Sequence, residues 1–147
     1  MANQTRYNYA SSSVLKALFK RKGGEGQYTR VVTTPSAFDG LNIADFRAGE
    51  EALIRYYKSE LLWCLLSNRR LRANNHGEPI NLGLDEIAAV GIDIKAEYLT
   101  GSKNKKDFSL LSVVDIKHAN HTLAFESGPP FYGIYNALGF AINRHLL

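Results

Sequence analysis

The sequence predicts an α+β fold, with an antiparallel sheet of about four strands packed against one long central helix and a C-terminal helix. Apolar residues recur at helical spacing over residues 44–68 and 130–145. Strand-like segments occupy residues 27–34, 92–98, 108–118 and 121–126. Because the last three of these segments follow one another, a meander is favoured over a parallel βαβ arrangement.

The composition is that of one globular unit. The chain has 147 residues, of which 45% are hydrophobic and 22% charged. We expect one domain over residues 1–147, with residues 1–10 as a loose N-terminal arm. Cys64 is the only cysteine, so an intramolecular disulfide and cysteine-type zinc modules are excluded. A polar N-terminus and the absence of an uninterrupted apolar run of about 20 residues predict a cytoplasmic protein without membrane contact.

Capping and spacing define the N-terminal elements. Ser11 or Ser12 can cap a helix over residues 11–22, and Gly23 with Gly24 ends it. The apolar stripe of this helix is Val14, Leu15, Leu18 and Phe19. A strand over residues 27–34 follows, and Pro35 stops it.

The long helix is predicted from a four-residue repeat formed by Leu53, Tyr57, Leu61 and Leu65. Trp63 is expected to anchor it. Cys64, which no motif marks as activated, is expected to be a small buried hydrophobe. A short helix over residues 84–91 is then predicted to end at Gly91.

Alternation predicts a half-buried strand over residues 92–98. One face would carry Ile92, Ile94, Ala96 and Tyr98, and the other Asp93, Lys95 and Glu97. The final helix contains a row of small residues spaced by four, Gly133, Ala137 and Ala141. We expect this row to pack closely on the sheet or on a neighbouring helix, with a self-association seam as the alternative.

The stretch DIKHANHTLAF, residues 115–125, predicts a hairpin with two histidines near its tip. A two-residue turn at Ala119 and Asn120 would place His118 opposite His121 on one face. In that register Ile116 pairs with Leu123, Val114 pairs with Phe125, and Asp115 faces away. A four-residue loop is the alternative, and it would free both histidines from the ladder.

A metal site would need a third or fourth ligand beside His118 and His121. The hairpin supplies none, and His76 and His145 are remote in sequence. The glycines at residues 23–26 follow a helix, whereas a phosphate-binding loop follows a strand. We therefore favour a polar hairpin tip and expect no catalytic residue, metal or cofactor.

The net charge of +4 is unevenly distributed. Residues 1–35 carry +5, and residues 67–83 and 101–117 carry +2 each. The basic residues form three groups: Lys20, Arg21 and Lys22 with Arg30; Arg69, Arg70 and Arg72; and Lys103, Lys105 and Lys106. Such groups can bind nucleic acid or an acidic protein surface, and the alternative is that they only keep the surface solvated. Three tyrosines accompany the first group and could stack on bases: Tyr7, Tyr9 and Tyr28.

No motif fixes a reaction, so the first functional expectation is a non-enzymatic binding protein. It would be a small inhibitor or accessory protein, of the mobile-element or phage counter-defence type, docking on a protein or nucleoprotein through charged surfaces. Arg69, Arg70 and Arg72 are the residues most expected to do so. One alternative is a nucleic-acid-binding protein that uses the basic groups. Another is a small enzyme that uses His118 and His121.

Overall fold

The computed structural model describes residues 11–33, 48–101 and 104–146. Predictions for residues 1–10, including Tyr7 and Tyr9, and for Pro35 and Lys103 fall outside these ranges, as does the side chain of His145. In chain order the elements are α2 (Ser12–Lys22), β1 (Thr29–Val31), β2 (Ala52–Ser59), β3 (Leu62–Ser67), β4 (Arg70–Asn75), β5 (Glu78–Gly83), the 3-10 helix η2 (Leu84–Glu86), β6 (Ile87–Ile92), α3 (Ile94–Leu99), the 3-10 helix η3 (Lys105–Asp107), β7 (Leu110–Asp115), β8 (Asn120–Ala124) and α4 (Pro129–Leu146).

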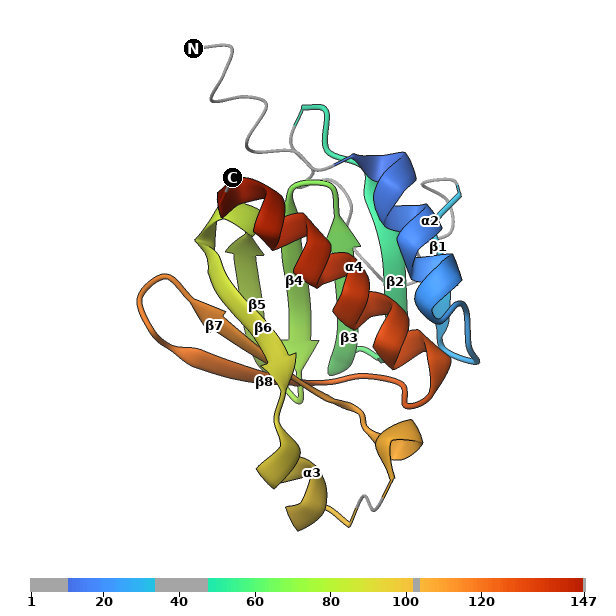
Figure 1. Cartoon of the computed structure of the whole chain (residues 1–147), viewed down its shortest axis with the longest axis vertical. Helices are drawn as coiled ribbons and strands as arrows, with labels where there is room; N and C mark the ends of the chain where they lie inside the picture. The colour runs from blue at the N-terminus through green and yellow to red at the C-terminus, as the bar shows by residue number, and fades with distance from the viewer. Residues whose placement is uncertain (1–10, 34–47, 102–103, 147) are drawn as a thin grey trace.

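The predicted α+β class with antiparallel pairing is confirmed. Strands β1 to β5 form one sheet in sequence order, and β6 to β8 form a second. Every strand pairing in the described part of the chain is antiparallel. Figure 1 shows α2 and α4 lying on the same face of the five-stranded sheet. One hydrophobic cluster takes residues from both helices and both sheets.

The predicted long helix is wrong. The described part of residues 44–68 contains β2 and β3, which pair as a hairpin with Tyr56 opposite Cys64. Four consecutive residues of β3, Cys64–Ser67, are buried, so this strand shows no alternation between a wet and a dry face. A short apolar run of this kind cannot be distinguished from a buried helix by periodicity alone.

Two neighbouring predictions are also wrong. Residues 87–92 form strand β6 rather than the end of a helix, and residues 94–99 form helix α3 rather than a strand. Asp93 caps α3, because its carboxylate accepts a hydrogen bond from the backbone N–H of Ala96 (3.0 Å). The expected faces are reversed, since Glu97 is fully buried while Ile94 and Tyr98 are exposed.

The two helices predicted at the ends of the described chain are confirmed. Helix α2 is capped by the Ser11 hydroxyl, which accepts from the Val14 N–H (3.4 Å), and it ends at Gly23. Helix α4 contributes its small residues to the interior, where Ala137 and Ala141 are fully buried. A Cβ atom built on Gly133 would lie 2.7 Å from Phe19 Cδ1. The small-residue row therefore packs closely on helix α2.

Polar side chains join the segments where strand pairing stops. The Asn75 amide donates to the Thr122 carbonyl (2.9 Å) and accepts from the Ala124 N–H (3.3 Å), so it ties β4 to β8. The Glu126 carboxylate accepts from the N–H groups of Gln27 (2.6 Å) and Tyr28 (2.9 Å). These bonds satisfy backbone donors that have no strand partner. None of the helices in the described ranges is both long and apolar enough to span a bilayer.

Two glycines of α4 provide a matched test of the contact between the helices. We expect Gly133→Ala to lower the free energy of unfolding by roughly 1–3 kcal/mol, because the added methyl group meets Phe19. Gly139 has nothing within 4 Å of an added Cβ, so Gly139→Ala should leave stability unchanged or raise it by up to about 1 kcal/mol. Urea unfolding of both variants measures the difference, and equal effects would contradict the close packing at Gly133.

Candidate nucleic-acid interface

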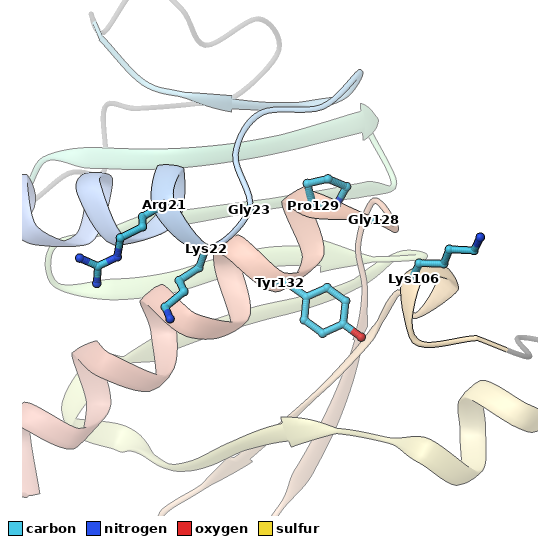
Figure 2. A pocket seen from close by; sticks show the side chains of 7 residues that line it. All are labelled: Arg21, Lys22, Gly23, Lys106, Gly128, Pro129 and Tyr132. Carbon is cyan, nitrogen blue, oxygen red and sulfur yellow. The ribbon is translucent and has the colours of Figure 1, made fainter.

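Arg21 and Lys22 of the first predicted basic group and Lys106 of the third line one hollow of about 430 Å³. Arg21 and Lys22 come from the last turn of α2, and Lys106 comes from η3, more than eighty residues later in the chain. The remaining lining residues are Gly23, Gly128, Pro129 and Tyr132. In Figure 2, Arg21 and Lys22 lie on one side of the Tyr132 ring and Lys106 lies on the other.

The close approach of α2 to α4 builds one wall of the hollow. A Cβ atom on Gly23 would overlap the Pro129 carbonyl oxygen and lie 2.6 Å from the Gly133 nitrogen. Only glycine leaves room for the two backbones at this point. Gly128 has a left-handed φ of 87°, and the carbonyl of this residue accepts from the Phe131 N–H (3.1 Å) as α4 begins. The basic end of α2 is thereby fixed beside the first turn of α4.

Tyr132 connects this wall to η3. The Tyr132 hydroxyl donates a hydrogen bond to the Lys105 carbonyl (2.6 Å). Burial, and then electrostatic interaction with Glu97 and Tyr135, raises the pKa of Tyr132. The hydroxyl therefore stays protonated at neutral pH and remains a donor. This bond keeps Lys105 and Lys106 next to the ring that the hollow exposes.

The described residues provide no charge partner for the cations of the hollow. Within the described ranges, Arg21, Lys22 and Lys106 take part in no ion pair, and no acidic residue lines the hollow. Arg21 and Lys22 are exposed neighbours of a third cation, Lys20, which does not line the hollow. Like charges held close together favour a bound anion.

The arginines of the middle group are placed differently. Residues Arg70–Asn75 form strand β4. Arg70 is only 4% exposed, and its Nε donates to Glu50 Oε2 (2.9 Å). Ser67 also donates to that carboxylate (2.6 Å). Arg69 and Arg72 are half-buried and interact within the chain. The Arg70 side chain therefore forms a buried ion pair with Glu50.

Arg72 belongs to a row on the sheet face opposite the helices. Cross-strand pairing runs from Arg30 through Arg55 and Leu65 to Arg72, and directly paired residues share a face. Leu65 is buried but is not part of the main hydrophobic cluster, and arginine stems can cover an apolar neighbour in this way. Arg30 lies 3.8 Å from Glu25, and Arg55 and Arg72 also interact within the chain.

The histidine hairpin has a four-residue loop, so the predicted two-residue turn is wrong. Val113 pairs with His121 and Leu111 with Leu123. Asp115 Oδ1 accepts from the N–H groups of Lys117 (2.8 Å) and Ala119 (3.0 Å), which closes the loop. His118 has a left-handed φ of 70° and is exposed. The loop alternative is confirmed for His118, whereas His121 stays in the ladder.

The prediction that Asp115 faces away is also wrong. Asp115 Oδ2 lies 3.0 Å from His121 Nε2. This hydrogen bond, followed by the one from the Ala119 N–H, holds the pKa of Asp115 below its ordinary value of 3.8. The described residues contain no group of three or more His, Cys, Asp or Glu side chains that could hold a metal ion. His76 is exposed and lies in the turn between β4 and β5.

Cys64 is buried in β3, as predicted. Burial raises the pKa of its thiol far above the ordinary range. The thiolate, which is the nucleophilic form, is therefore strongly disfavoured.

Sequence analysis did not single out Tyr132, and it assigned α3 to a strand. No pattern around Tyr132 distinguishes it from Tyr135, because its role depends on the hydrogen bond to Lys105. The cap at Asp93 was a usable signal for α3, since an aspartate just before a run of helix-forming residues commonly starts a helix.

Removal of Arg70 should damage the fold more than removal of a cation at the hollow. We expect Arg70→Ala to lower the free energy of unfolding by roughly 3–5 kcal/mol, because the Glu50 carboxylate would stay buried without this partner. Lys106→Ala, at an exposed position, should change it by no more than about 0.5 kcal/mol. Urea unfolding of both variants tests this, and similar values would contradict the structural role of Arg70.

The contact between Asp115 and His121 predicts a pH dependence of stability. Because folding lowers the Asp115 pKa, the ionised carboxylate stabilises the fold above the pKa of the unfolded chain, and this contribution is lost as pH falls through the folded pKa. The stability difference between the parent and Asp115→Asn should therefore shrink as pH drops from about 5 to about 2.5. Glu78→Gln, at an exposed carboxylate of β5, is the control. A difference that stays constant over this range would contradict the prediction.

Comparison with protein-family models, with curated proteins and with solved structures finds no match to this chain. The candidate interface is accordingly defined by its own geometry. Cations from α2 and η3, which have no ion-pair partner among the residues that the structure describes, lie on both sides of a tyrosine ring in a hollow.

Proposed function

We propose that this chain is a nucleic-acid-binding protein and that it holds phosphate groups around the hollow between α2, α4 and η3. The observation that carries the proposal is the placement of Arg21 and Lys22 on one side of Tyr132 and of Lys106 on the other. No carboxylate of the described residues is paired with these three groups.

The spread of the cations favours a polymer over a single compact anion. In Figure 2, the Arg21 and Lys22 side chains extend together on one side of the ring, and the Lys106 side chain extends on the opposite side. A chain with a phosphate at every nucleotide can meet cations on both sides of the ring at once. Each contact releases condensed counterions, which provides affinity without any base-specific hydrogen bond. Arginine can also contact a phosphate through two parallel hydrogen bonds.

The half-buried ring of Tyr132, which lines the hollow, adds a second kind of contact. Aromatic side chains beside cationic groups are used to stack bases in proteins that bind single strands. The bond from the Tyr132 hydroxyl to Lys105 fixes the orientation of the ring before binding, so little rotational freedom is lost on association.

An acidic protein surface is the second candidate partner, and it corresponds to the first expectation from the sequence. Carboxylates can pair with the same cations. The specific observation in favour is helix α3, which exposes the apolar side chains of Ile94, Tyr98 and Leu99, since exposed apolar groups near a charged rim are common at protein interfaces. An inhibitor or accessory protein of a nucleoprotein would fit either candidate.

Salt dependence tests the proposed function. Binding of labelled single-stranded DNA and RNA should weaken steeply with salt concentration, as measured by fluorescence anisotropy. Replacing Arg21, Lys22 and Lys106 together by alanine should make the slope of log affinity against log salt shallower by about 2, since each lost phosphate contact removes about 0.7 for single strands.

The matched control removes the same charge elsewhere. It replaces Lys16, Lys58 and Lys117, which do not line the hollow, and it should keep a slope close to that of the parent. The proposal fails if neither DNA nor RNA binds, if binding is insensitive to salt, or if both triple variants lose the same slope.

A further inference from the structure

We infer that helix α3 presents Tyr98 as a stacking platform for an unpaired base, so that the chain prefers single-stranded over double-stranded nucleic acid. This inference rests on the proposed function and assigns the substrate class of that site. It is carried by the exposed side chains of α3, their rigid attachment and their position next to η3.

The exposed surface of α3 is unusual for a helix of six residues. Tyr98 is 60% exposed and Leu99 is 78% exposed, and Ile94 adds a further 45%. A soluble surface carries single apolar residues without special meaning, but three on one short helix form a contiguous contact surface. Figure 1 shows α3 projecting away from the two helices that cover the sheet.

A buried carboxylate fixes α3 in this position. Glu97 is fully buried, and its Oε2 accepts hydrogen bonds from the N–H groups of Ser109 and Leu110 (2.7 Å each). Charge-assisted bonds of this kind are about twice as strong as neutral ones. The next residue, Tyr98, is turned by about 100° around the helix axis and is 60% exposed, whereas Glu97 is fully buried.

The Tyr98 ring is held on one side and open on the other. It packs edge-on against Phe108, with ring centroids 6.4 Å apart, and Phe108 is buried. One support of this kind orients the ring and leaves its remaining surface to a ligand. A base stacked on such a ring contributes about 1–3 kcal/mol in single-strand-binding proteins.

Tyr98 lies along the chain path from the hollow. Phe108, which it contacts, is two residues from Lys106, and two residues span at most about 7 Å. A strand held at Lys106 can therefore reach Tyr98 within the 4–16 nucleotides that such sites commonly cover.

The charges near α3 favour nucleic acid, rather than an anionic membrane, as the ligand that contacts this helix. Within α3 and its cap, Lys95 is offset by Asp93, and Glu97 is buried. The helix itself therefore provides no excess of positive charge to attract anionic lipid, which polybasic segments do. The cations needed for a polyanion are supplied by the adjacent hollow.

The test compares a single strand of about 16 nucleotides, free of self-complementarity, with the duplex of the same sequence. The parent should bind the single strand more tightly. Tyr98→Ala should weaken single-strand binding by about 5- to 150-fold and leave duplex binding unchanged. Tyr98→Trp should bind the single strand about as tightly as the parent, because tryptophan also provides an aromatic ring. Ile116→Ala is the control, because Ile116 is 56% exposed at the far end of β7 and is not near η3.

The outcomes separate the two proposals. If the parent binds neither form, the proposed function and this inference both fail. If it binds both forms equally and Tyr98→Ala changes nothing, while the triple variant at the hollow weakens binding, only the inference about α3 fails. The inference is likewise overturned if Tyr98→Ala abolishes capture of a protein partner but leaves single-strand binding intact.

Discussion

The close contact between α2 and α4 is the constraint on which the rest of the molecule depends. Gly23 and Gly133 allow the two backbones to approach where any side chain would overlap its neighbour. The contact joins the first and the last element of the described chain, and both cover one face of the five-stranded sheet. It also places the basic end of α2 beside the first turn of α4, which is where the hollow forms.

Acidic side chains provide the second level of organisation. Glu97, Glu126 and Asp115 each accept hydrogen bonds from two backbone N–H groups that lie in loops or at the start of a strand. Glu50 forms a buried ion pair with Arg70. These carboxylates act as structural acceptors, as buried polar groups generally must.

The elements that the sequence predicts correctly are those with strong local signals. Residues 11–22 have a serine cap, a helical stripe and terminal glycines, and residues 130–145 have helical spacing after a Gly-Pro-Pro break. The β2–β3 hairpin was missed because burial on both faces of β3 removes the alternation that marks a strand. Helix α3 was missed because the same residues alternate, and only the Asp93 cap distinguishes the two conformations.

The sequence predicts the basic residues of the candidate site but not their arrangement in space. Lys22 and Lys106 are recognisable as basic from the sequence, but their placement around Tyr132 is a consequence of tertiary packing. Arg70, which belongs to an equally basic segment, is buried with Glu50. Local charge density cannot distinguish these situations, because the partner of Arg70 lies twenty residues earlier in the chain.

The buried thiol of Cys64 has a practical consequence. Because this is the only cysteine and its thiolate is strongly disfavoured, maleimide reagents should leave the folded chain unlabelled. A cysteine introduced at an exposed position of α3 or η3 would then be modified selectively. The native chain thus offers a ready background for attaching a fluorophore or spin label and for measuring distances to a bound ligand without removing any residue of its own.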